Sequence, residues 1–171
     1  MAAALAGSLL AGAPAALADD KAMIDANTER ALSWLSASDK DTRKLLEKAA
    51  GVLVFPDIVE MGFGVGGEFG EGALVVNGET VGYYATAGST FGMGPQSEYK
   101  AEVIFFMTEE ALNDFRERRS TKVGQHVSIP VAASGSAALA SREDRVGIIF
   151  SEDGMVSDLV MEGDRITRIS R

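Results

Sequence analysis

The string "GFGVGGEFGEGALVVNGE" at residues 62–79 is the first candidate for chemistry, because Gly62, Gly64 and Gly67 spell G-x-G-x-x-G. In dinucleotide-binding proteins this motif follows a strand and opens a helix whose N-terminus holds the pyrophosphate. Here the residues after Gly67 contain no helix start, and a hairpin strand is predicted next. We therefore expect extended chain from Met61 to Gly72 and no nucleotide site.

The same glycines have a structural interpretation. Gly62, Gly64 and Gly66 alternate with Phe63 and Val65, and alternate residues of a strand share a face. One face would then be bare glycine, which allows a neighbouring element to approach the backbone closely or the strand to bend sharply.

Other patterns of catalytic residues are incomplete. The string "SEYK", Ser97–Lys100, matches the S-x-x-K of acyl-serine enzymes, but it leads into a predicted strand and its partner motifs are absent. His126 is the only histidine, there is no cysteine, and no G-x-S-x-G elbow occurs. Glu68 and Glu71 fall on opposite faces of a strand, which is wrong for a carboxylate pair. We expect no enzyme, no catalytic residues, no metal site and no cofactor.

Two basic clusters remain as candidate binding residues. They are Lys40, Arg43, Lys44 and Lys48 on a predicted helix, and Arg116, Arg118, Arg119 and Lys122 after a second predicted helix. Each cluster could be an ordinary solvated face, or it could attract phosphate head groups at about 1 kcal/mol per basic residue near an anionic surface. Trp34 could lie at a membrane interface or pack against the fold.

The elements that would carry these residues begin with helices. Apolar residues recur at helical spacing between Asp19 and about Ala50, and Ser38 with Asp41 reads as a capping box for a second helix starting near Asp39. Gly51 suits the left-handed turn after that helix.

After residue 51 the apolar period changes to two. "GVLVFP" is predicted as a short strand stopped by Pro56, and Asn77-Gly78 as the turn of a hairpin. "AEVIFFM" is predicted as a strand buried on both faces, followed by a short helix capped by Thr108. Residues 131–140 could be a loop or a flat strand.

Residues 145–170 are predicted to be a meander that turns at residues 153–154 and 163–164. Helices followed by many antiparallel strands indicate an α+β fold. We expect the N-terminal helices to pack on a bent, mostly antiparallel sheet or a partly closed β-barrel.

The composition and the N-terminal residues limit the class of partner and the cellular location that we expect. The 171 residues are 46% hydrophobic and carry 16 basic against 25 acidic side chains, a net charge of −9, which disfavours nucleic acid as a partner. Residues 1–18 are apolar and end in Ala16-Leu17-Ala18, which is typical of a signal peptide. No basic residue precedes Lys21, so a buried Ala-rich helix is the alternative. Residues 19–171 are expected to form one domain: a helical lead-in over 19–50, then a β-rich core with one short helix.

Residues 51–171 resemble the SYLF domain family. The strings that carry the resemblance are "AAGVLVFPDIVEMGFGVGGEFGEGALVVNGETVGYY", "EVIFFMTEEALNDF" and "GIIFSEDGMVSDLVMEGDRITRI". The resemblance implies a lipid-binding module, which in eukaryotic members recognises phosphoinositides, whereas bacterial relatives look like exported envelope proteins. The family motif is glycine and apolar, so the candidate lipid-binding residues come from the two basic clusters.

The sequence thus predicts an exported protein at the periplasmic, peripheral face of a membrane. It would bind anionic phospholipid reversibly through Lys40, Arg43, Lys44, Lys48, Arg116, Arg118, Arg119 and Lys122. The alternative is an envelope protein–protein interaction module without catalytic activity, whose protein partner is unknown.

Overall fold

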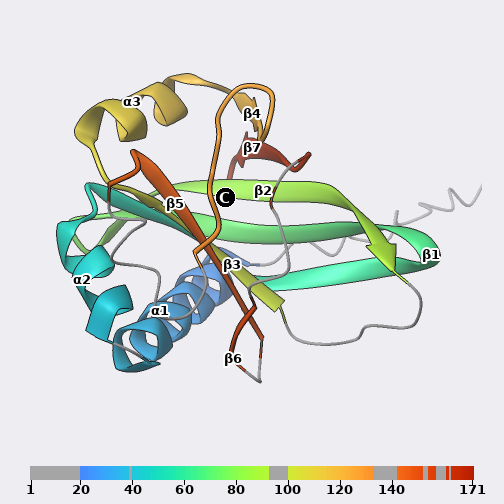
Figure 1. Ribbon diagram of the computed structural model, residues 1–171, viewed down its shortest axis with the longest axis horizontal. Helices are drawn as coiled ribbons and strands as arrows, with labels where there is room; N and C mark the ends of the chain where they lie inside the picture. The colour runs from blue at the N-terminus through green and yellow to red at the C-terminus, as the bar shows by residue number, and fades with distance from the viewer. Residues whose placement is uncertain are drawn as a thin grey trace, which may run out of the picture.

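The computed structural model describes residues 20–38, 40–92, 100–132, 142–151, 154–156, 161 and 163–171 (Figure 1). The predicted signal peptide, most of the ambiguous stretch 131–140 and Ser97 of "SEYK" lie outside these residues. The described elements are α1 (Lys21–Ser38), α2 (Lys40–Lys48), β1 (Gly51–Val76), β2 (Glu79–Gly92), β3 (Lys100–Phe106), α3 (Glu109–Glu117), β4 (Ser120–Lys122), β5 (Arg145–Ser151), β6 (Gly154–Val156) and β7 (Arg165–Ile169).

The strands form one curled sheet in the order β4-β7-β2-β1-β3-β5-β6, and all neighbouring strands are antiparallel. The N-terminal helices pack on this half-barrel, as Figure 1 shows, so the predicted α+β class is confirmed. The predicted hairpin turn and the predicted helix cap are also present. Asn77 and Gly78 have φ values of 52° and 81°, which suit a tight hairpin turn, and the Thr108 hydroxyl accepts a hydrogen bond from the Ala111 N–H.

β1 is a single strand of 26 residues that joins two parts of the sheet. It pairs with β3 through residues 51–58 and with β2 through residues 64–76. No helix follows Gly67, so the prediction of extended chain from Met61 to Gly72 is confirmed. The prediction that Pro56 stops the strand is wrong. The register with β3 shifts between Phe55 and Ile58, and at such an irregularity a residue without an N–H is tolerated.

The two halves of β1 approach each other closely where two glycines face the first half. A Cβ at Gly72 would overlap the carbonyl oxygen of Val54, and one at Gly70 would lie 2.9 Å from the Asp57 carbonyl oxygen. Bare backbone at these positions lets the sheet curl. The predicted glycine face at residues 62–66 lies largely outside the described side chains.

Gly51 also has a role different from the predicted one. It is the first residue of β1 and is not among the described residues with positive φ, so it makes no left-handed turn. A Cβ there would lie 2.9 Å from the Leu112 side chain of α3. The glycine therefore makes room for α3.

The second helix begins at Lys40, close to the predicted Asp39. The Ser38 hydroxyl, which is predicted to cap this helix, donates to the Leu35 carbonyl within α1.

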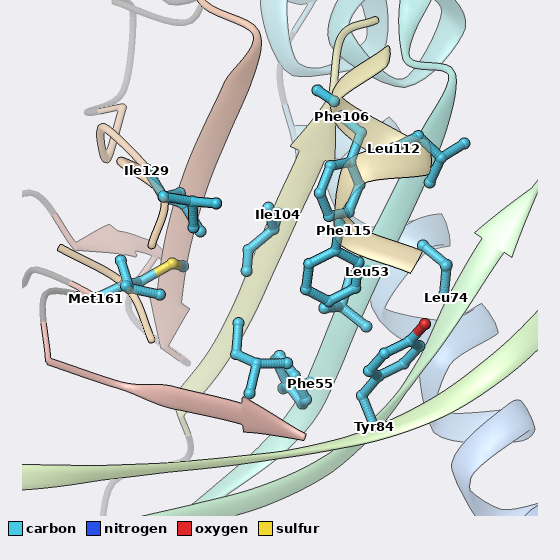
Figure 2. Packing of buried hydrophobic residues seen from close by; sticks show 14 of the residues in the cluster. Leu53, Phe55, Leu74, Tyr84, Ile104, Phe106, Leu112, Phe115, Ile129 and Met161 are labelled. Atoms are coloured by element: carbon cyan, nitrogen blue, oxygen red, sulfur yellow. The ribbon is translucent and has the colours of Figure 1, made fainter. Parts of the chain in front are cut away.

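Side chains of alternating strand positions form two cores on opposite faces of the sheet. The inner core gathers residues from β1, β2, β3, β5 and β7, and α3 covers it with Leu112 and Phe115 (Figure 2). The outer core lies under α1 and α2, which contribute Leu35 and Leu45. Every residue of β3 is buried, which confirms the prediction of a strand covered on both faces.

The predicted C-terminal meander is wrong in its last step. β5 and β6 pair as expected, but β7 does not lie beside β6. It crosses to the other edge of the sheet, where it pairs with β2 and β4. Gly154 and Gly163 have φ values of 119° and 100°, so both predicted turn glycines adopt conformations that favour glycine. The crossing places Asp164 inside the curled sheet, where it is 4% exposed.

Candidate functional site

The first basic cluster lies on the solvent side of α2. Helical spacing turns Thr42 and Leu45 inward, where both are buried. The remaining side of the helix carries the exposed residues Lys40, Arg43, Lys44 and Lys48. The structure therefore brings these four predicted residues together on one exposed surface, which we call the α2 stripe.

The α2 stripe keeps an excess of positive charge. Lys44 lies 3.1 Å from the Asp41 carboxylate, and the Arg43 Nε donates to the Ser36 carbonyl at 2.9 Å. Within the part of the chain that the structure describes, Lys40 and Lys48 make no ion pair. Four basic against two acidic residues give α2 a net charge of +2.

The second basic cluster is balanced by acidic neighbours. Arg116, Arg118 and Arg119 are exposed, and Lys122 is half-buried in β4. The Arg118 guanidinium lies 2.8 Å from the Asp114 carboxylate, and this pairing raises the pKa of Arg118. Residues 109–122 contain four basic and four acidic side chains, so the segment has no net charge. It is a weaker candidate for binding an anionic surface than the α2 stripe.

The two clusters lie on opposite faces of the sheet. Leu45 of α2 belongs to the outer core and Phe115 of α3 to the inner core. In Figure 1, α3 lies above the sheet, and α2 lies below it near the same end. A flat membrane laid on one helix face would therefore leave the other cluster pointing away from it.

A surface pocket of about 320 Å³ adjoins the second cluster. It is lined by Asn113, Arg116 and Glu117 of α3 together with Arg168 of β7. Burial raises the pKa of the Tyr84 phenol, and the positive charges of Arg168 and Arg116 oppose that shift. Arg168 could not be predicted as a neighbour of Arg116 from the sequence, because β7 meets α3 only in the folded chain.

Two further predicted candidates have structural roles. Trp34 stacks on Phe150 with ring centroids 4.7 Å apart and remains 40% exposed, so it packs on β5 from the outside. His126 is exposed, and its Nδ1 accepts the Lys122 N–H at 3.0 Å. His126 is thus a surface histidine that is hydrogen-bonded to the backbone.

A buried charged cluster at one end of the curled sheet was missed by the sequence analysis. Glu68 of β1, Lys100 and Glu102 of β3, and Asp164 before β7 are each at most 8% exposed. The Lys100 Nζ lies 2.5 Å from Glu68 Oε2 and 3.1 Å from Glu102 Oε1. Glu71, on the opposite face of β1, pairs instead with Arg171, as the predicted alternation requires.

The charges in this cluster shift two pKa values. Burial opposes the charge on Lys100, but the carboxylates of Glu102 and Glu68 outweigh burial and raise its pKa. Burial, followed by the negative charges of Glu102 and Glu68, raises the pKa of Asp164 to about 8, against the weaker opposing effect of Lys100. Without another cation in the cluster, Asp164 is protonated in the folded protein at neutral pH.

Stability should therefore depend on the protonation of Asp164. In metal-free buffer, the folded state holds one more proton than the unfolded state at pH values between the ordinary carboxyl pKa of 3.8 and about 8. The contribution of this proton to the free energy of unfolding is fully present below pH 3.8. It is lost as pH rises towards about 8, by at most about 1.4 kcal/mol per pH unit. Urea unfolding of the wild type and Asp164→Asn across pH 4–8 measures it. The variant should lack this component, and equal slopes would contradict the assignment.

Comparison with models of protein families finds no match, and neither does comparison with the curated proteins. Among the described residues, no helix is long and apolar enough to cross a membrane. The basis for a functional proposal is thus the geometry of the charged groups and the sequence strings themselves.

Proposed function

We propose that this protein is an exported, SYLF-type lipid-binding protein that associates reversibly with anionic phospholipid. The observation that carries the proposal is the α2 stripe, in which exposed Lys40, Lys44 and Lys48 lie along one side of a helix that covers the outer core, with exposed Arg43 beside them. The resemblance of residues 51–171 to the SYLF family supports the same function. The setting that fits both is the periplasmic side of a membrane, where the protein would be peripheral.

The physical argument is local electrostatics. The chain as a whole carries a net charge of −9, so an anionic bilayer repels most of its surface. Basic residues close to such a bilayer gain about 1 kcal/mol each, and the attraction falls off within a screening length. Binding through the α2 stripe would therefore be orientation-specific, weak and reversible.

The Arg116–Arg168 pocket offers a second contact of a different kind. Two guanidinium groups beside an asparagine amide can donate to an individual phosphate group, for which arginine provides paired donors, although the Glu117 carboxylate in the same lining opposes an anion. In this proposal the α2 stripe provides attraction to the bilayer, whereas Arg116, Arg118, Arg119 and Lys122 contribute less because acidic neighbours balance them.

A protein–protein interaction module is the alternative function. Strand addition at a sheet edge is its simplest mode, but the described edge strands β4 and β6 are each three residues long. Short edge strands offer few backbone groups to a partner strand. The exposed basic surface of α2 favours the lipid proposal over this mode of interaction.

Liposome flotation tests the proposal. The wild type should float with vesicles that contain phosphatidylglycerol and remain unbound with pure phosphatidylcholine. Its affinity should fall by roughly tenfold or more between about 0.1 and 1 M salt, as the screening length shrinks from about 10 Å to about 3 Å. Flotation that is indifferent to lipid charge and to salt would reject the proposal.

A further inference from the structure

The buried cluster of Glu68, Glu102 and Asp164 contains more negative charge than its one lysine can neutralise. One carboxylate oxygen from each of the three residues lies within 4.8 Å of the others. Among the described residues, Lys100 forms ion pairs with Glu68 and Glu102 but not with Asp164. With all four groups ionised, the cluster would carry a net charge of −2 in an interior that disfavours unpaired charge.

A second, independent observation concerns the Asp164 carboxylate. The residue is 4% exposed, and its Oδ2 is buried without a hydrogen-bond partner. A buried acceptor left unpartnered costs free energy, and such atoms in a folded protein need a physical explanation. A cation bound between the three carboxylates would supply the missing partner.

The backbone also leaves space for these carboxylates. A Cβ at Gly88 would overlap Asp164 Oδ1 and would lie 2.8 Å from Glu68 Oε1. A side chain at position 88 would force one or both carboxylates to move. Gly88 in β2 thus leaves room for Asp164 and Glu68 to lie close together.

We propose that Glu68, Glu102 and Asp164 form a binding site for one hard divalent cation, with Ca²⁺ as the best-fitting ion. Calcium is bound by carboxylate oxygens at about 2.3–2.6 Å, so oxygens around one ion lie at most about 5 Å apart, which the cluster satisfies. A divalent ion would neutralise the net charge of −2. Magnesium usually keeps several waters and fits a dry, carboxylate-lined site less well.

Softer metals fit the cluster poorly. The chain has no cysteine, and its one histidine is exposed, with Nδ1 already accepting the Lys122 N–H. Oxygen-only donor sets select calcium, magnesium or manganese rather than zinc or copper. Lys100 remains as a tethered cation beside Glu68 and Glu102, so the site should be of moderate affinity.

Calorimetry and thermal unfolding of the full chain after chelator treatment test the site, with CaCl₂ as the probe. The wild type should bind one ion per chain, and its Tm should rise by about 5–10 °C when calcium reaches about 100 times its Kd. Asp164→Asn loses one ligand charge and should bind calcium at least roughly tenfold more weakly. Glu71→Gln, three residues from Glu68 on the opposite face of β1, should bind like the wild type.

Two results would overturn the proposal. One is the absence of both heat and Tm shift with calcium, magnesium or manganese at about 10 mM, above the Kd of weak extracellular calcium modules. The other is Asp164→Asn that folds and binds calcium as tightly as the wild type. The wild-type measurement needs no variant, so it tests calcium binding even if Asp164→Asn folds poorly. Liposome flotation tests the proposed lipid function independently of calcium binding.

Discussion

Replacement of Gly72 by alanine should reduce the free energy of unfolding by about 3 kcal/mol, because overpacking against rigid atoms leaves no cheap relaxation. The added methyl group would overlap the Val54 carbonyl oxygen and would lie 2.8 Å from the Phe55 ring. Those atoms belong to the other half of β1, so the two halves would have to separate. Urea unfolding followed by circular dichroism measures the loss.

Gly67→Ala is the matched control for Gly72→Ala. Gly67 lies in the same strand, and the nearest atom to its added methyl group would be the Gly88 carbonyl oxygen at 3.6 Å, an ordinary contact. A change within about 0.5 kcal/mol is expected there. Equal losses for the two variants would mean that close approach within β1 does not determine the curl of the sheet.

Lys100→Met should lower the free energy of unfolding by about 3–5 kcal/mol at neutral pH with chelator present. The substitution keeps the length of the buried chain but leaves Glu68 and Glu102 without the ammonium group that lies 2.5 and 3.1 Å from them. The loss should shrink as pH is lowered, since protonated carboxyls need no counter-ion. Urea titrations at pH 7 and pH 5 measure both effects.

Lys21→Met is the control for Lys100→Met, because it removes an ion pair at the surface. Lys21 lies 3.3 Å from the Asp25 carboxylate at an exposed site. Exposed ion pairs contribute little to stability, so its unfolding midpoint should stay close to that of the wild type. If Lys100→Met were equally mild, the buried cluster would not depend on its lysine.

Features set by neighbouring residues could be predicted from the sequence. The Asn77-Gly78 turn, the Thr108 cap and the two-sided burial of β3 all follow from local conformational preference and apolar spacing. The exposure of the α2 stripe follows as well, because residues spaced by four share one side of a helix. The α+β class rests on these local elements.

Features set by distant residues could not be predicted in this way. Pro56 breaks strands in general, but here it lies at a register shift whose existence depends on β3. The choice of β7 to pair with β2 and β4 instead of β6 depends on the curl of the whole sheet. Gly51 follows a predicted helix and so matches the pattern of a helix terminator. Its close approach to Leu112 could not be predicted, because it joins residues 61 positions apart.

The buried cluster was missed for the same reason. Glu68, Lys100 and Asp164 are separated in sequence and meet only when the sheet curls. One local signal was present, because Glu102 is a carboxylate inside a strand predicted to be buried on both faces. A charge at such a position requires a partner, so Glu102 indicates a buried ion pair.

The central claim, that the α2 stripe binds anionic phospholipid, is tested most directly by two variants with the same net charge. Lys40→Glu/Lys44→Glu/Lys48→Glu reverses the stripe, whereas Arg30→Glu/Arg142→Glu/Arg165→Glu reverses three exposed charges elsewhere. Flotation with phosphatidylglycerol vesicles at low salt should show at least a roughly 100-fold loss of affinity for the first variant, from three contributions of about 1 kcal/mol, and a much smaller loss for the second. Equal affinity for the two variants would contradict the account.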